Sequence, residues 1–363
     1  MSRYEIIQET RSGLQAYRLL DHQRYAEAVV YPELGNNCVV FRTTPDPDHN
    51  NQTSEATDVV DVFMPPADIA SLRDVPFTGG NPILFPFPNR VREGIFTFEG
   101  ETYNMKGLMA RGWDAGAGQA LHGLVADKPW TVTEAFADEG AAVIHATIQL
   151  DAFPDILEQY PFPCRLEVRY SLRDGILTMQ STVQNMGDKS LPMGYGIHPW
   201  FPARLRSNTT LPGDITAISM EQRAQSLVHV PADAIWELKD LMPTGTIQPV
   251  EGGQYDLRHF APLKDHFFDD VFTKVRFRAD GWSEGGLRDP ETGLEMYLSA
   301  DARFREWVLY APLNSPVIAL EPYTCATDAV NLNAQGFDAG LIALPPGQLW
   351  TGDIRFGLRR FTK

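Results

Sequence analysis

Glycine and proline interrupt this chain so often that long helices are nearly excluded. The sequence holds 29 glycines and 27 prolines among its 363 residues. Proline lacks a backbone donor and glycine loses the most conformational entropy on folding, so helix interiors tolerate neither residue well. The segments between these residues carry many β-branched and aromatic side chains, which favour strands. The sequence therefore predicts a chain built mainly of β-strands.

Two segments show the alternation of apolar and polar residues that is typical of half-buried hairpins. The first is CRLEVRYSLRDGILTMQSTVQN (164–185), with turn residues Asp174 and Gly175 at its centre. The second is GIFTFEGETYNM (94–105), which turns at Glu99 and Gly100. We expect further strands in AAVIHATIQL, EMYLSA, EWVLYAP, PVIALEPY and GDIRFGLRRF.

Helices are expected in only two short segments. One spans 66–74 and begins with a proline, and the other spans 233–241 and is stopped by Pro243. The polar stretch TTPDPDHNNQTSEATD (43–58) has almost nothing to bury, which indicates a surface loop insertion. The pattern predicts an all-β fold, a large antiparallel β-sandwich with a few short helices. No linker divides it, so we expect a single domain over residues 1–363.

Charge and composition narrow the range of partners. A formal net charge of -16 argues against nucleic acid and anionic membranes, since both repel an acidic surface. The N-terminus has no apolar signal region and the chain has no apolar run of about 18 residues, so we expect no export and no membrane span. The three cysteines are far apart, which favours neither disulfides nor zinc and suits the cytoplasm. These features fit a protein that acts on a neutral small molecule.

A histidine and a glutamate stand out among the candidate functional residues. His198 lies in MGYGIHPWFPARL, where glycines and a proline build a tight backbone and Trp200 follows. Glu321 ends the apolar run 317–320, and a carboxyl at the end of a buried strand needs a partner or a chemical role. The alternatives are a histidine that only packs in the core and a glutamate at an exposed edge.

Three more stretches place polar groups beside stiff backbone. Arg90 ends the proline-rich segment NPILFPFPNR, where it either lies at the surface or turns its donors toward a polyhydroxyl ligand. His122 precedes a glycine in QALHGLVADKPW and is either a core or capping residue or part of a site. In HFFDDVFTKV, Asp269 and Asp270 stand among aromatic residues, where an unpaired buried carboxylate is costly unless the segment is a solvated turn.

Sequence signatures of other chemistries are missing from the chain. It has no HExxH or paired CxxC, no GxGxxG or Walker loop, and no GxSxG elbow. We therefore expect no metal and no cofactor, and general acid and base chemistry remains.

The ordered set of stretches resembles the aldose 1-epimerases, or galactose mutarotases. The segments that carry the resemblance are NPILFPFPNRVREGIFTFEGETYNM, LHGLVADKPW, GYGIHPWF, DDVFT and LEPYTCATDAVNL. The resemblance implies the galactose mutarotase-like supersandwich, with Glu321 as general base and His198 as general acid. It also implies that Arg90, His122 and Asp269 bind the sugar. The family pattern places this aspartate three residues before a phenylalanine, here Phe272, which selects Asp269 over Asp270.

The implied reaction is ring opening and reclosure of an aldohexose, with a monosaccharide as the partner and a monomer or homodimer as the assembly. Both catalytic groups swap roles, so we expect pKa values near the working pH, which a histidine has unaided and a glutamate reaches by partial burial. One alternative is a hexose-6-phosphate 1-epimerase, with Arg92 and Arg111 as phosphate ligands. Another is a non-catalytic sugar-binding or regulatory protein on the same fold. The unusual segment 107–123 has Arg111 and Trp113 as candidates to shape the sugar pocket.

Overall fold

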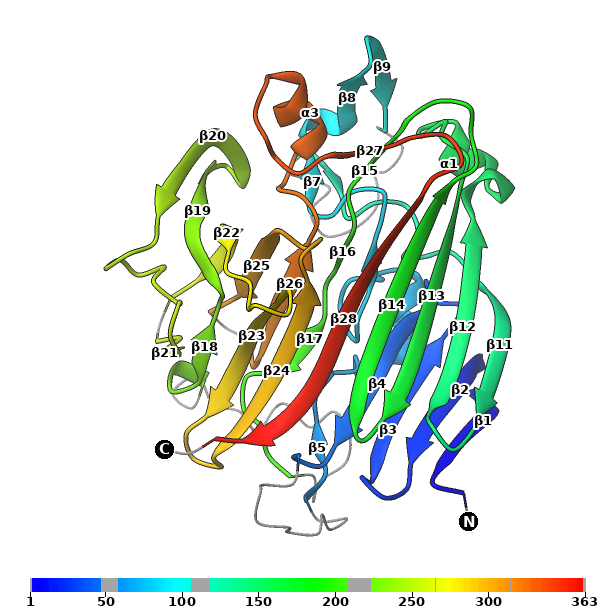
Figure 1. Cartoon of the computed structure of the whole chain (residues 1–363), viewed down its shortest axis with the longest axis vertical. Helices are drawn as coiled ribbons and strands as arrows, with labels where there is room; N and C mark the ends of the chain where they lie inside the picture. The colour runs from blue at the N-terminus through cyan, green and yellow to red at the C-terminus, as the bar shows by residue number, and fades with distance from the viewer. Residues whose placement is uncertain are drawn as a thin grey trace.

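The computed structural model describes residues 2–46, 58–105, 118–207, 223–264, 266–313 and 315–361. In these ranges the chain consists mainly of antiparallel strands, which confirms the predicted β-sandwich with a few short helices (Figure 1). Two large sheets contribute side chains to one main apolar core. The expected insertion at 43–58 falls mostly outside the described residues.

Within the described ranges, nine strands form the larger sheet, and β28 runs through its middle between β14 and β24 (Figure 1). In sheet order the strands are β11 (Thr131–Ala137), β12 (Ala142–Gln149), β13 (Cys164–Arg173), β14 (Ile176–Asn185), β28 (Leu349–Arg360), β24 (Leu294–Asp301), β23 (Trp282–Asp289), β18 (Leu227–His229) and β21 (Ala261–Pro262). The predicted hairpin at 164–185 is β13 and β14, with Arg173 opposite Ile176. Its alternation buries one set of side chains in the core.

The second large sheet has eight strands among the residues described. Its order is β20 (Met242–Pro249), β19 (Ala232–Lys239), β22 (Phe268–Val275), β25 (Glu306–Ala311), β26 (Val317–Tyr323), β16 (Gly196–Ile197) and β6 (Ile83–Leu84), with β17 (Trp200–Pro202) also paired to β26. Strand β26 lies near the centre and is buried along its whole length. The side chains discussed below gather around this strand.

The remaining described strands form smaller sheets. An N-terminal meander consists of β1 (Tyr4–Arg11), β2 (Leu14–Asp21), β3 (Ala26–Tyr31), β4 (Asn37–Thr43) and β5 (Val60–Asp61), and it contacts β11 to β13. Three two-stranded pairs are β7 (Arg90–Val91) with β10 (Ala120–Leu121), β8 (Ile95–Phe98) with β9 (Glu101–Asn104), and β15 (Leu191–Met193) with β27 (Ile342–Leu344). The pair β8 and β9 is the second predicted hairpin.

Helices are short in the part of the chain that the structure describes. They are the α-helices α1 (Pro154–Leu157) and α3 (Ala329–Ala334) and the 3-10 turns η2 (Ile69–Arg73), η3 (Arg92–Gly94) and η6 (Leu150–Ala152). The helix predicted at 66–74 is present as η2, where the Asp68 side chain accepts from the backbone N–H of Ala70 at 3.0 Å. None of the described helices has the length and apolar character needed to cross a bilayer.

The helix predicted at 233–241 is wrong, because this segment is strand β19. It pairs with β20 on one side and β22 on the other, so its backbone groups find partners in two neighbouring strands. The indole N–H of Trp236 donates to Glu306 at 3.1 Å, which ties the strand to β25. Pro243 lies inside β20 rather than at a helix end. Tertiary pairing thus overrides the local helical tendency of the segment.

Candidate active site

Strand β26 turns its two ionisable side chains away from the main core. Ile318 and Leu320 belong to that core, and side chains alternate along a strand, so Glu321 and Tyr323 share the opposite face. Glu321 lies opposite Val308 of β25, and only 1% of the residue is exposed. The structure therefore buries this carboxyl in the middle of a sheet, which rules out the edge carboxylate considered above.

His198 lies beside this carboxyl, in the short connection between β16 and β17. Its Nε2 is 3.5 Å from Oε1 of Glu321. The backbone is fixed by two hydrogen bonds, from His198 N–H to the carbonyl of Pro82 at 3.0 Å and from Trp200 N–H to that of Gly80 at 2.9 Å. The imidazole stacks on the Trp200 ring, with 5.0 Å between centroids and 26° between planes. The predicted acid and base are thus neighbours.

The glycines of the GYGIH stretch make room for side chains of β26. Gly196 pairs directly with Tyr323, and a Cβ on Gly196 would lie less than 3.0 Å from the Tyr323 ring. A Cβ on Gly194 would likewise meet Sγ of Cys325. These positions exclude larger residues because Tyr323, at the end of β26, and Cys325, just after it, approach so closely.

Arg90 begins β7, and His122 directly follows β10, the strand paired with it. The backbone N–H of Asn89 donates to Nδ1 of His122 at 3.2 Å, and the N–H of His122 donates to the carbonyl of Asn89 at 2.8 Å. Since Nδ1 accepts a hydrogen bond, the imidazole carries its proton on Nε2 and can donate it. Asn89 and His122 both have positive φ, 57° and 60°, which sets the direction of each side chain.

The guanidinium of Arg90 is held on two sides. Its Nη1 donates to Oδ1 of Asn89 at 2.8 Å, and its Nη2 is 3.8 Å from Oδ2 of Asp269. The N–H of Asp328, just before α3, donates to the carbonyl of Arg90 at 2.9 Å. Arg90 is 4% exposed, so it is a buried cation and not the surface residue considered above.

The register of β22 distinguishes the two neighbouring aspartates. Asp269 lies opposite Tyr310 and Asp270 lies opposite Leu309, a residue of the main core. Asp269 therefore shares the face of Glu321, near Arg90, whereas Asp270 points to the other face of the sheet. Burial raises the pKa of Asp270 to about 6. Both residues lie within a strand, so the solvated turn is also ruled out.

Burial shifts the pKa values of Glu321 and His198 in opposite directions. It raises the pKa of Glu321 well above the usual value; the Tyr323 hydrogen bond and the charge of Arg90 oppose that shift, while Asp269 adds to it. Burial, together with the charge of Arg90, lowers the pKa of His198 to about 4. The expectation for glutamate thus agrees with the structure, but the histidine is shifted away from neutrality because it is buried. Burial, His198 and Arg90 also lower the pKa of His122 well below its usual range.

Aromatic rings surround these polar groups. Phe77 is 4.8 Å from the His122 ring and Tyr310 is 5.8 Å from the Trp200 ring, centroid to centroid. The Trp200 indole donates to the carbonyl of Phe77 at 2.7 Å, which fixes the wall. The sequence indicated Trp200, but Phe77 and Tyr310 were missed because they come from distant segments.

Tyr323 is a further residue that the sequence interpretation missed. Its hydroxyl donates a short hydrogen bond to Oε2 of Glu321. The spacing of two residues along one strand was the available signal, since it places both side chains on one face.

Arg92, proposed as a phosphate ligand, is engaged elsewhere. Its Nε is 3.5 Å from Oδ2 of Asp328, and its backbone N–H donates to Oδ1 at 3.0 Å. Arg111 and Trp113 lie outside the described residues. In the described ranges, no group of three or more His, Cys, Asp or Glu side chains could hold a metal ion.

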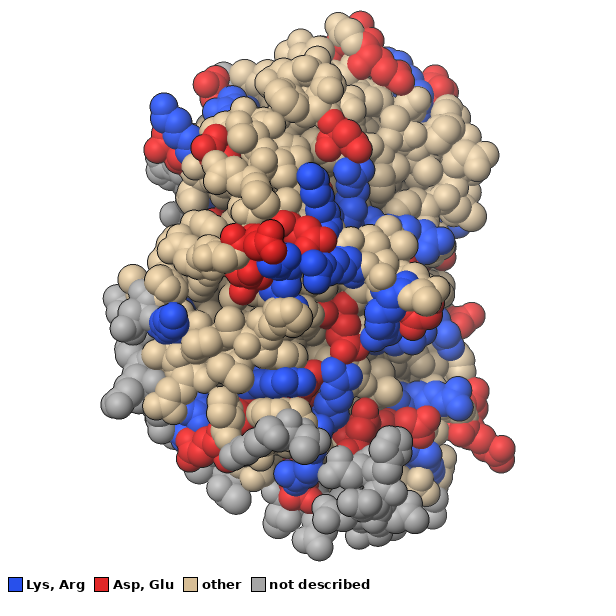
Figure 2. Space-filling view, turned by 60° about the vertical axis from the view of Figure 1, so that its left-hand side comes forward, with Lys and Arg blue, Asp and Glu red and all other residues tan. Residues whose placement is uncertain are grey.

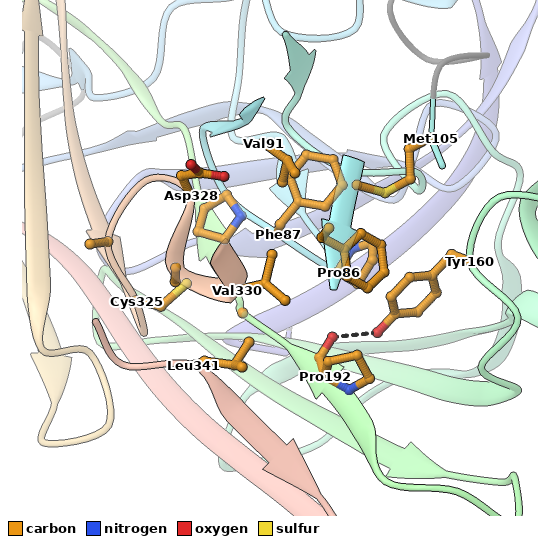
Figure 3. Close-up of a pocket in the computed structure, with 15 residues that line it drawn as sticks. Pro86, Phe87, Val91, Met105, Tyr160, Pro192, Cys325, Asp328, Val330 and Leu341 are labelled. Atoms are coloured by element: carbon orange, nitrogen blue, oxygen red, sulfur yellow. Dashed lines mark hydrogen bonds between the residues drawn. The ribbon is translucent and has the colours of Figure 1, made fainter. Parts of the chain in front are cut away.

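A small apolar cavity lies behind the site (Figure 3). Phe87, Val91, Met105 and Val330 are among its lining residues, and the hydroxyl of Tyr160 donates to a backbone carbonyl beside it at 2.7 Å. Its volume of about 30 Å³ suits one or two waters and is too small for a sugar. None of the five candidate residues lines it, and of the two residues of β7 only Val91 does.

Comparison with known proteins agrees with the resemblance drawn from the sequence. The model of the aldose 1-epimerase family matches residues 50–357. A curated relative is the uncharacterized protein YihR of Escherichia coli K12, which is 24% identical over 259 residues, 71% of this chain and 74% of that protein.

Solved structures share the fold at low sequence identity. A galactose mutarotase-like protein from Clostridium acetobutylicum superposes with a TM-score of 0.82 at 17% identity and covers 99% of both chains. Galactose 1-epimerase from Lactobacillus acidophilus superposes with a TM-score of 0.71 at 13% identity and covers 100% of both chains. A putative aldose 1-epimerase from Escherichia coli K12 gives 0.65 at 18% identity, over 93% of this chain and 96% of that one.

Proposed function

This chain belongs to the aldose 1-epimerase family, and we propose that it is a mutarotase that interconverts the α and β anomers of an aldohexose such as galactose or glucose. The observation that carries the proposal is the buried pair of Glu321 and His198, with Nε2 and Oε1 3.5 Å apart. A carboxyl and an imidazole placed together can remove one proton and supply another in the same step.

In the proposed reaction, Oε1 of Glu321 takes the proton of the C1 hydroxyl while Nε2 of His198 gives a proton to the ring oxygen. The electron pair of the C1 hydroxyl forms the carbonyl, and the bond between C1 and the ring oxygen breaks. Rotation about C1–C2 then presents the other face of the aldehyde to the C5 hydroxyl. Reclosure returns both protons and yields the other anomer.

The acid and base need only one shared proton between them. It lies on His198 when the closed sugar is bound and on Glu321 when the sugar is open. Burial disfavours both charged groups, so the free site favours the proton on Glu321. The charge of Arg90 favours the carboxylate form of Glu321. Sugar hydroxyls that donate hydrogen bonds to this carboxylate would favour that form further. Both effects move the proton toward His198, the position from which the ring opening starts.

The other candidate residues suit the hydroxyl groups of a neutral sugar. Arg90 and Nε2 of His122 offer donors, whereas Asp269 offers an acceptor on the same face. Their fixed geometry argues for orientation of the ring rather than loose capture. The engagement of Arg92 by Asp328 disfavours a 6-phosphate as substrate. A sugar-binding protein would not need both Glu321 and His198. A cytoplasmic location and a monomer or homodimer remain predictions.

Polarimetry of freshly dissolved α-galactose and α-glucose tests the proposal, with the matching 6-phosphates as further substrates. We expect the wild-type protein to accelerate anomer exchange of a free sugar. Glu321→Gln should abolish this acceleration, because the amide keeps the shape of the side chain but has no basic oxygen. Exchange of the 6-phosphates alone would favour the phosphate alternative. A folded wild-type protein that accelerates none of them would favour the binding protein.

A further inference from the structure

Tyr323 occupies one oxygen of the proposed base. Its hydroxyl donates to Oε2 of Glu321, and the whole residue is inaccessible to solvent. The other oxygen, Oε1, is the one that lies 3.5 Å from Nε2 of His198. The two oxygens of this carboxyl therefore have different surroundings, one bound within the sheet and one turned toward the acid.

The ring of Tyr323 has no room to swing away from this position. It stands between two neighbouring strands, opposite Gly196 of β16 and opposite Glu306 of β25. The close approach at Gly196 already excludes a Cβ, so the ring fills that side. On the other side, the Glu306 carboxyl is held by Trp236 at 3.1 Å and by Thr273 at 3.0 Å. The hydroxyl is thus fixed by packing.

We propose that Tyr323 is a positioning residue that reserves Oε1 of Glu321 for the substrate proton and stabilises the carboxylate form of that base. This inference rests on the proposed function of the site. A donor on one oxygen stabilises negative charge on the carboxyl and fixes its rotation about the last side-chain bond. Burial raises the pKa of Tyr323 well above its usual value, so the phenol keeps its proton and remains a donor.

Other charged and titratable groups also face this carboxyl. They come from β7, the β16–β17 connection, β22 and β25, and they are Arg90, His198, Asp269 and Tyr310. Arg90 and Tyr323 favour the carboxylate, whereas burial and Asp269 favour the protonated acid. Because Tyr323 alone among these is bonded to Oε2 in the described structure, its removal should change the ionisation of Glu321 in a known direction.

The test compares Tyr323→Phe with Tyr195→Phe as a matched control. Tyr195 is equally buried, and its hydroxyl bonds to the Ser181 hydroxyl at 2.7 Å, away from the site. For Tyr323→Phe we expect kcat on the aldose to fall roughly ten- to hundred-fold, with KM changed by less than about threefold. The acid limb of the pH profile of kcat/KM should move up by about one pH unit. Tyr195→Phe should leave the limb in place.

An unshifted acid limb in folded Tyr323→Phe would overturn the inference. If that variant does not fold, Tyr323→3-fluorotyrosine replaces it, since this residue keeps the ring and the hydroxyl but makes the phenol a stronger donor. It should move the limb down, and an unchanged limb would again overturn the inference.

A second measurement separates this inference from the proposed function. Infrared difference titration follows the Glu321 carboxyl without any substrate, with Glu321→Gln to assign the band. An upward shift of its ionisation in Tyr323→Phe supports the positioning role even if the wild-type protein accelerates no sugar. No shift overturns the role even if the wild-type protein is an active mutarotase.

Discussion

Carboxylates gather in two parts of the molecule that differ in what lies beside them. On the nine-stranded sheet, Arg288 of β23 is 2.6 Å from Glu295 on the neighbouring strand β24, and Arg359 of β28 is 2.7 Å from Glu284 of β23, one strand further on. On the face shown in Figure 2, acidic and basic side chains likewise lie next to one another. Around β26, by contrast, Glu321 and Glu306 are almost fully buried, and neither has a cation at hydrogen-bond distance among the described residues.

The contrast appears in the ionisation of these groups. Burial alone would raise the pKa of Glu284, but Arg359 and its other partners lower it below the usual value. Burial dominates at Glu306, whose pKa is raised to about 8 although Thr273 and Trp236 donate to it. A raised pKa therefore marks burial and does not identify a catalytic group. Glu321 differs from Glu306 in having the imidazole of His198 beside it, whereas Arg305 lies 3.8 Å from Glu306.

The largest expected effect distinguishes the histidines of the two regions. His198→Asn should lower kcat by roughly a hundred- to ten-thousand-fold, the usual contribution of general acid catalysis. His229→Asn serves as the control, since His229 lies in β18 of the other large sheet, is half-buried, and has its Nδ1 2.9 Å from the carbonyl of Leu257. Steady-state polarimetry measures kcat for both variants. Equal activity of the two variants would contradict a catalytic role of His198.

The next effect concerns stability and Glu306. Its folded pKa of about 8 exceeds the usual 4.5, so the folded protein holds this proton more tightly and its contribution to stability is lost as pH rises from 4.5 to 8. The Gln amide does not titrate, so Glu306→Gln does not lose stability as pH rises. At pH 7 its unfolding free energy should therefore exceed that of the wild type by about 3 kcal/mol.

Urea unfolding at pH 5 and pH 8 measures this difference. The advantage of Glu306→Gln should grow with pH, whereas mutarotation should stay near the wild-type rate. An advantage that is the same at both pH values would show that burial does not raise this pKa.

A smaller effect is expected for the arginines. Arg90→Lys loses the forked donors that reach Asn89 and Asp269, so KM for the sugar should rise by roughly ten- to thirtyfold. Arg288→Lys is the control on the nine-stranded sheet. There the guanidinium pairs with Glu295, and its Cζ lies 3.8 Å from the centroid of the Phe260 ring. Initial rates over a range of sugar concentrations decide this, and an unchanged KM for Arg90→Lys would contradict the binding role.

The smallest effect is expected at the paired carboxylate Glu284. Glu284→Gln should lower the unfolding free energy by less than about 1 kcal/mol, because Arg278 and Arg359 are partly exposed and solvent screens the pairs. The loss should shrink in high salt and fade at acidic pH, where the wild-type carboxylate is protonated. A loss of several kcal/mol would mean that these pairs are as critical as the groups around β26.

The local alternation of apolar and polar residues made much of the fold predictable. The hairpins at 94–105 and 164–185 carry both strands and turn within one short segment, so their pairing needs no distant information. The segment 233–241 failed for the opposite reason, because its neighbours β20 and β22 were needed to hold it as a strand. Strand order depends on such pairings, which a single sequence does not contain.

The candidate site likewise has features that the sequence predicts and features that only the fold creates. Short motifs identified Glu321 and His198 as chemically suited, but their 3.5 Å separation depends on how the segments around β16 and β26 come together. Tyr323 was accessible from the spacing of two residues along a strand. Tyr310 and the burial that lowers the pKa of His198 emerge only when distant segments pack together.

The most direct test of the central claim is a double-mutant cycle on the rate of α-galactose mutarotation, with Glu321→Gln, His198→Asn and the double variant. If the two groups share one proton and act as a unit, each single substitution should abolish nearly all acceleration, and the double variant should lose no more than either one. A single variant that is correctly folded and keeps more than about a tenth of the wild-type rate would contradict the account.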